Sequence, residues 1–203
     1  MGPVRRPPYR PAPAPPGWHH AGVGTAPLSS VDGLLEALGS LRDHAGDDVV
    51  PTLAHLLQTA DALAAAHPGD PGLVVAGLVH DIATGLDPGC ADHARAGAAL
   101  VAPLLGERVG QLVAGHAEAK RYLVTVEPSY ARALSPDSTA TLARQGGAMT
   151  GDEVRSFARG PHRADLVALR RADDGAKVPG RAVRPLGEWR AVLDEVARRP
   201  GPP

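Results

Sequence analysis

The chain has 203 residues, a formal net charge of -1 and one cysteine, Cys90. This length suits one domain with a substantial hydrophobic core and is short for two. The balanced charge gives no overall field that would draw the protein to nucleic acid or to an anionic membrane, and one cysteine excludes an intramolecular disulfide and a thiolate-rich zinc site. No apolar run approaches the ~18 residues that cross a bilayer. The N-terminus also lacks the apolar stretch that is typical of a secretory signal. We therefore predict a cytoplasmic protein that binds neither nucleic acid nor membrane.

The first part of the chain is rich in proline, with eight prolines from Pro3 to Pro27. This density blocks helix formation and leaves little apolar surface to pack. We predict that residues 1–28 form a disordered proline-rich arm and that residues 29–199 form one folded domain. His19 and His20 lie in the arm, where we expect them to be exposed to solvent and not to bind metal.

The rest of the sequence predicts an all-α domain. The chain contains only two Trp, three Tyr and one Phe, which favours helices packed through small side chains over a β-sandwich. Apolar periodicity, N-cap residues and Pro or Gly stops predict helices in the following order: from Ser29 and Ser30 to about Asp43, from Pro51 to His67, from Pro71 to Asp81, about Asp92–Leu105, Glu107–Val124, Ser138–Arg144, Asp152–Ala158, Pro161–Ala172 and Leu186–Arg198.

A charged pair, His80-Asp81, ends the most apolar of these helices. Burying an Asp without compensation costs several kcal/mol, so this carboxylate needs a cation or strong hydrogen bonds. A metal ion would supply the compensation. Because adjacent helical residues point about 100° apart, one helix can offer an imidazole to one ion and a bridging carboxylate to a second.

Taken singly, the other candidate ligands have plainer interpretations. His55, His93 and His116 each fit a hydrogen-bonded helix histidine better than a ligand. Asp173 could form a surface salt bridge with Lys177 at a helix end.

In combination and in order, these residues resemble the signature of the HD-domain superfamily. The resemblance implies an all-α HD-domain bundle with a buried dinuclear metal site. In that family the first His, the His-Asp doublet and the last Asp bind one metal ion, and the Asp of the doublet bridges to the second ion. The resemblance thus implies the ligand set His55, His80, Asp81, His93, His116 and Asp173.

Two further segments resemble the HD-domain oxygenases with a mixed-valent diiron centre, a group that includes inositol oxygenase and phosphonate-cleaving enzymes. The first is the sequence His-Ala-Glu-Ala-Lys that ends at Lys120. Its i to i+4 spacing places the ammonium on the face of His116, where it can hold a phosphonate or phosphate. The second comprises residues 145–149 and 169–179. Because this group places a Lys four residues after the last ligand, Lys177 selects Asp173 over Asp174.

The sequence also departs from this group. The phosphonate oxygenases carry a Tyr and a Glu upstream of the first His, where this chain has Ala45 and Asp48. After the doublet they read Ile-Gly-His, whereas this chain has Thr84 in place of the second His. We therefore expect the residues that gate the active site to differ from those of the phosphonate oxygenases, and the exact substrate stays undetermined.

The resemblance predicts an oxygenase that uses two iron ions and O2 to cleave a C-P or C-C bond of a small anionic phosphonate or a polyol. Lys120 would bind the anionic end of the substrate, and Gln145 and Thr84 would orient it. The same ligands also suit a phosphohydrolase with manganese, magnesium or cobalt. A third alternative is a degenerate HD domain that acts as a binding module, although the intact ligand set argues against it.

Overall fold

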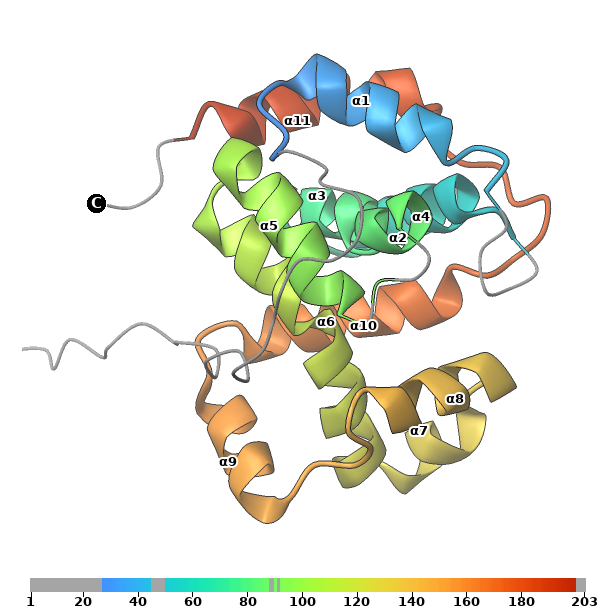
Figure 1. The fold of residues 1–203 in the computed structure, drawn as a ribbon, viewed down its shortest axis with the longest axis vertical. Helices are drawn as coiled ribbons and strands as arrows, with labels where there is room; N and C mark the ends of the chain where they lie inside the picture. The colour runs from blue at the N-terminus through green and yellow to red at the C-terminus, as the bar shows by residue number, and fades with distance from the viewer. Residues whose placement is uncertain (1–26, 45–49, 88–89, 91, 200–203) are drawn as a thin grey trace, which may run out of the picture.

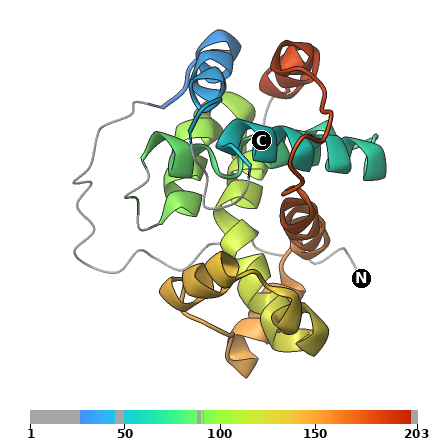
Figure 2. The same ribbon diagram turned by 90° about the vertical axis from the view of Figure 1, so that its right-hand side faces the viewer.

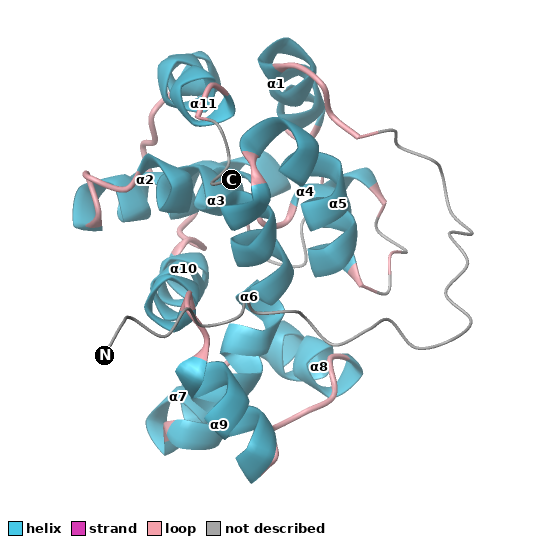
Figure 3. Ribbon diagram, turned by 90° about the vertical axis from the view of Figure 1, so that its left-hand side faces the viewer, coloured by secondary structure: helices cyan, strands magenta, loops and turns pink. Residues whose placement is uncertain are grey.

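The computed structural model describes residues 27–44, 50–87, 90 and 92–199. Within these ranges the regular elements are all helices (Figure 3), which confirms the predicted all-α class. The residues that precede Pro27, with His19 and His20, lie outside the described part of the chain, as do Ala45 and Asp48. The boundary between an arm of residues 1–28 and a domain of residues 29–199 therefore stays a prediction.

Every predicted helix is present, with ends that differ by a few residues, and two short helices were not predicted. The elements are α1 (Val31–Ser40), α2 (Thr52–Ala66), α3 (Pro71–Val79), α4 (Ile82–Leu86), α5 (His93–Leu105), α6 (Glu107–Val126), α7 (Pro128–Ala133), α8 (Pro136–Arg144), α9 (Gly151–Arg159), α10 (Arg163–Gly175), the 3-10 turn η1 (Leu186–Trp189) and α11 (Arg190–Ala197). The unpredicted helices are α4 and α7. Neither is long enough to show a helical repeat of apolar residues.

Side chains of the preceding residues cap several of these helices. The Ser30 hydroxyl accepts a hydrogen bond from the main-chain N of Gly33 at 3.1 Å. Asp70 caps α3 in the same way, by accepting from Leu73 N at 3.0 Å. Each cap satisfies a main-chain donor that the first helical turn leaves free.

Helix α3 forms the centre of the bundle. Seven consecutive residues from Leu73 to Val79 are buried, because this helix is apolar on all sides. Helices α2, α6, α10 and α11 pack against it. In Figure 1, α1 and α11 lie above α3, and α10 lies below it. Among the described residues, no helix has both the length and the apolar character that a membrane span requires.

Two close helix contacts depend on glycine. A Cβ atom at Gly77 of α3 would lie 2.5 Å from Leu63 Cδ1 of α2, and one at Gly115 of α6 would lie 2.8 Å from Leu166 Cδ2 of α10. Only a residue without a side chain lets these backbones approach so closely. The second contact immediately precedes His116 and so fixes the position of that side chain relative to α10.

Helices α7, α8 and α9 gather at one end of the molecule, beyond the C-terminal half of α6 (Figures 1 and 2). The stacked rings of Tyr122 on α6 and Phe157 on α9, with centroids 4.6 Å apart, join α9 to α6. Helix α7 buries no residue of its own. The hydroxyl groups of Tyr130 on α7 and Thr141 on α8 contact residues of the site described next.

Candidate metal centre

The His80-Asp81 pair lies at the junction of α3 and α4. His80 follows the last residue of α3 in a helical conformation, and Asp81 leaves it with φ -109° and ψ 19° before α4 begins. The chain bends between the two residues, so their side chains are not simply neighbours on one helix. His80 is fully buried, whereas a quarter of the Asp81 side chain is exposed.

One group of ligand atoms comprises those of His55, His80 and Asp173. The Nε2 atoms of His55 and His80 lie 3.2 Å apart. Asp173 Oδ1 lies 3.3 Å from His55 Nε2, and Asp173 Oδ2 lies 3.8 Å from His80 Nε2. Three buried residues from α2, the end of α3 and α10 thus present their donor atoms to one point.

A second group comprises Asp81, His93 and His116. The Nε2 atoms of His93 and His116 lie 3.2 Å apart. Asp81 Oδ1 is 3.4 Å from each of these atoms. These residues come from the junction of α3 and α4, the first position of α5 and the middle of α6.

Asp81 divides its two oxygens between the groups. Its Oδ2 atom faces the first group, 3.5 Å from His80 Nε2 and 4.0 Å from His55 Nε2, while its Oδ1 atom faces the second. Oδ1 is buried and has no hydrogen-bond donor among the described residues. A buried carboxylate oxygen without a donor costs about 1–3 kcal/mol or more, unless a cation compensates it.

Three of the four histidines are held with a proton on Nδ1. The Nδ1 atoms of His55, His80 and His116 contact the carbonyl oxygens of Ala176, Gly77 and Val113 at 3.0, 2.9 and 2.7 Å. A carbonyl only accepts, so each Nδ1 carries the proton, and in the neutral form of each ring Nε2 presents a lone pair. Main-chain acceptors of this kind are the usual partners of metal-binding histidines.

The imidazoles of the site differ in their electrostatics. Burial opposes a charge on His55, but the hydrogen bond and charge of Asp173 outweigh burial and raise the pKa of this ring. Burial lowers the pKa of His80 to about 4 and also lowers the pKa of His93. Burial opposes the charge of Asp173, but the Arg170 guanidinium outweighs it and holds the pKa of this carboxyl well below its usual range. The donor set of four imidazoles and two carboxylates, with facing lone pairs, fits a site for metal cations with nitrogen and oxygen ligands.

The carboxylates of Asp173 and Asp174 face different partners. Asp173 lies in the first group and also accepts a hydrogen bond from Arg170 Nη1 at 2.7 Å. Asp174 instead accepts from the Tyr130 hydroxyl at 2.7 Å and pairs with Arg170. Asp173, and not Asp174, therefore lies with His55 and His80 in the first group. Asp173 is buried and paired with Arg170, so it is not a surface ion-pair residue.

Lys120 is a buried cation on the helix that carries His116. Its side chain is one turn further along α6, and the residue is only 3 % exposed. Its ammonium donates to Thr141 Oγ1 at 2.7 Å, the one hydrogen bond that the described residues supply to it. Since an ammonium has three donors, Lys120 retains capacity to bind an anion.

Gln145 lies beside the second group. It lines a polar cavity of about 320 Å³ together with His93, Arg121 and Arg144. Its buried Oε1 atom has no partner among the described residues, and the same is true of the Thr84 hydroxyl. Thr84 is not among the residues that line this cavity.

The sequence interpretation gave no role to Arg170, Tyr130 or Thr141. Arg170 stands three residues before Asp173, a spacing that places both side chains on one helical face, and this was an available signal. Tyr130 and Thr141 lie in a part of the chain with weak apolar periodicity. Nothing in the sequence indicates that their hydroxyl groups contact Arg170 and Lys120.

The HD-domain profile matches residues 52–144, the stretch that carries the candidate ligands except Asp173. A helical bundle with this ordered set of His and Asp residues is the arrangement of an HD domain. The chain therefore belongs to the HD-domain family.

Two curated relatives are phosphonate dioxygenases. The chain is 33% identical over 182 residues to hydroxymethylphosphonate dioxygenase of Gimesia maris, a match that covers 85% of this chain and 90% of the relative. It is 31% identical over 159 residues to [1-hydroxy-2-(trimethylamino)ethyl]phosphonate dioxygenase (glycine-betaine-forming) of Leisingera caerulea. This match covers 71% of this chain and 80% of the relative. The predicted relationship to the phosphonate-cleaving HD-domain oxygenases is confirmed, and the relatives and the buried His/Asp groups together support a metalloenzyme.

Proposed function

We propose that this protein is a diiron oxygenase that cleaves the C-P bond of a small phosphonate with a hydroxyl group on the carbon next to phosphorus. The observation that carries the proposal is the position of Asp81. Its two oxygens face two separate pairs of imidazoles, an arrangement that suits a bridged dinuclear centre. A buried Lys120 one helical turn from His116 adds a site for an anionic group.

In this proposal one ion is held by His55, His80 and Asp173, the other by His93 and His116, and Asp81 bridges them. Imidazole and carboxylate ligands suit iron, and the bound iron pair would supply the redox chemistry with O2. The protein contributes ligand orientation through the main-chain acceptors of the Nδ1 atoms, and it buries His55, His80, His116 and Asp173.

Lys120 and Gln145 have distinct proposed roles. The ammonium of Lys120 neutralises the phosphonate, and its contact with Thr141 fixes the direction in which it points. The free Oε1 of Gln145 accepts a hydrogen bond from the substrate beside His93. Thr84 is a further candidate for orienting the substrate, because its buried hydroxyl is unpaired among the described residues.

The named substrates of the two relatives support a phosphonate over a polyol. Both names describe a phosphonate with a hydroxyl group on its first carbon. An uncharged polyol offers no anion to a buried ammonium, whose desolvation then has no compensation. We therefore prefer the C-P substrate to the C-C alternative.

The test uses protein expressed with iron and purified without oxygen. Metal analysis with Mössbauer and EPR spectroscopy should find about two coupled irons per chain, and the signal should shift when hydroxymethylphosphonate is added. Cleavage that places both oxygen atoms in the products should consume one O2 for each phosphate released. A Lys120→Met variant serves as a control that keeps the ligands.

The alternatives give different results in the same assays. A phosphohydrolase would release phosphate from a phosphate ester under nitrogen with manganese, magnesium or cobalt, and without O2 uptake. A binding module would show no turnover with any of these substrates. Either result would overturn the oxygenase proposal.

A further inference from the structure

A layer of side chains lies behind the candidate ligand Asp173. Arg170, which is 5 % exposed, donates from Nη1 to Asp173 Oδ2 at 2.7 Å. Oδ2 accepts this bond and lies 3.8 Å from His80 Nε2, whereas Oδ1 lies 3.3 Å from His55 Nε2. The Arg170 guanidinium therefore holds the Asp173 carboxylate in the orientation in which Oδ1 lies closer to the imidazoles than Oδ2.

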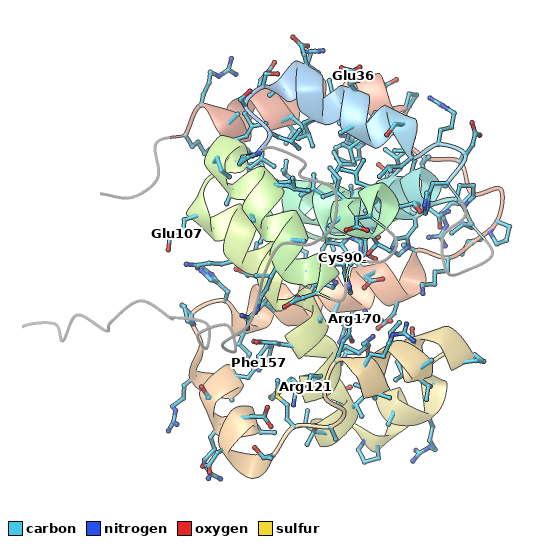
Figure 4. The ribbon with its side chains drawn as sticks, in the orientation of Figure 1. Glu36, Cys90, Glu107, Arg121, Phe157 and Arg170 are labelled. Atoms are coloured by element: carbon cyan, nitrogen blue, oxygen red, sulfur yellow. The ribbon has the colours of Figure 1, made fainter. Side chains whose placement is uncertain are left out.

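Tyr130, which lies outside α10, contacts Arg170 and Asp174. Its hydroxyl donates to Asp174 Oδ2 at 2.7 Å and accepts from Arg170 Nε at 3.0 Å. Arg170 also pairs with Asp174 through Nη2 and Nε. Figure 4 shows Arg170 on α10, on the side where α7 and α8 lie. Arg170 and Asp174 both belong to α10, so Tyr130 of α7 supplies a contact to this pair from a different helix.

We propose that Tyr130 is a positioning residue of the metal centre, one that holds the Arg170 guanidinium so that the Asp173 carboxylate keeps its orientation toward the metal. The inference rests on the proposed function, because it assumes that Asp173 is a ligand. Tyr130 touches neither substrate nor metal in this scheme. It acts through Arg170.

The need for an external contact follows from the flexibility of arginine. A free Arg side chain has about 2 kcal/mol of rotamer entropy. Its planar guanidinium can also pair with either of two adjacent carboxylates on one helix, so more than one arrangement is available. The phenol contacts Nε, the atom next to the side-chain stem, and so fixes the plane of the fork. Burial raises the pKa of Tyr130, which keeps its hydroxyl protonated as a donor to Asp174.

The experiment measures metal affinity and not turnover. The full-length protein is stripped of metal, checked for its helical circular dichroism, and titrated with Mn2+ while the EPR sextet of free Mn2+ reports binding. Tyr130→Phe keeps the ring and removes only the hydroxyl. We expect this variant to bind one of two Mn2+ ions about tenfold more weakly, the lower end of the 10–100-fold range for loss of an outer partner of a ligand. Its thermal midpoint without metal should stay close to that of the wild type.

Tyr122→Phe is the matched control. Tyr122 stacks on Phe157, and the described residues provide no hydrogen bond to its hydroxyl. This variant should bind Mn2+ as the wild type does. If Tyr122→Phe lowered the Mn2+ affinity as much as Tyr130→Phe does, the loss of any tyrosine hydroxyl would explain the effect, and the proposal would be overturned.

A double-mutant cycle separates positioning from mere anchoring of α7. Arg170→Lys removes the fork, so Tyr130→Phe should cause no further loss of Mn2+ affinity in that background. Additive losses, or equal affinity of wild type and Tyr130→Phe, would overturn the positioning role while leaving the two-ion centre in place. A wild type that fails to bind two Mn2+ ions would overturn the proposed function as well.

Discussion

The Nε2 atoms of His55 and His80 lie 3.2 Å apart, and the Nδ1 atom of each ring donates to a main-chain carbonyl. Two lone pairs that face each other at this distance repel unless a proton or a metal cation lies between them. The same contact recurs between His93 and His116, also at 3.2 Å. Asp81 has one oxygen toward each pair, so its removal affects both halves of the centre.

Asp81→Ala should abolish binding of both metal ions, because each half of the centre loses its shared carboxylate. Metal analysis of the purified variant measures this directly. Added metal should raise the thermal midpoint of the wild type and leave that of the variant unchanged. Asp61→Ala, which removes a surface carboxylate paired with Arg184, should keep both ions. Full metal content in the Asp81 variant would show that this residue does not bridge.

Lys120→Met should keep the metals and weaken substrate binding. A hydrogen bond to a charged group contributes about 1.5–3 kcal/mol, so the KM for hydroxymethylphosphonate should rise by about 10-fold to 100-fold. Steady-state kinetics with metal analysis of the same sample test this. A variant with lost metal and unchanged KM would place Lys120 among the residues that support the ligands.

The pH dependence of substrate capture should follow Lys120. Burial, followed by the charge of Arg170, lowers the pKa of this ammonium to about 8. The group is charged below that pH and neutral above it, so kcat/KM should fall as the pH rises through about 8. Lys120→Met should show a low value without this fall. If the fall persists in the variant, another group causes it.

Thr141→Val should raise KM through Lys120. The substitution removes the acceptor of a buried ammonium, which then loses its fixed direction, and we expect an increase of several-fold to about tenfold. Metal content should not change. Thr139→Val is the control, because this exposed hydroxyl on the same helix donates only to the Ser135 carbonyl. Equal effects of both valines would point to a change in α8 as a whole.

Gly115→Ala should destabilise the contact between α6 and α10. Its Cβ would lie 2.8 Å from Leu166 Cδ2, and overpacking of this kind costs about 1–3 kcal/mol. Thermal or denaturant unfolding measures the loss. Gly187→Ala, where the new atom meets nothing within 4 Å, should have little effect. Adding Leu166→Val should recover part of the stability, and no recovery would mean that the clash lies elsewhere.

The helices of this protein were largely predictable because their apolar residues repeat with the helical period. Leu73 to Val79 form a run so apolar that a central helix was the natural interpretation, and α3 occupies that place. Helix α4 has five residues and α7 buries none, so neither leaves a pattern in the sequence. Helix α4 begins directly after the bend at Asp81, and Tyr130 of α7 contacts Asp174 and Arg170 of α10.

The sequence by itself determined the helical class, the family and an ordered set of His and Asp residues. Apolar periodicity and residue order are properties of the sequence that do not depend on how the helices pack. Only the tertiary structure decided that Asp173 faces His55 while Asp174 faces Tyr130. Neighbouring residues on a helix point about 100° apart, and the packing of α10 against α2 and α6 selects which of them lies inside. The division of the Asp81 oxygens likewise arises only when four helices meet around one carboxylate.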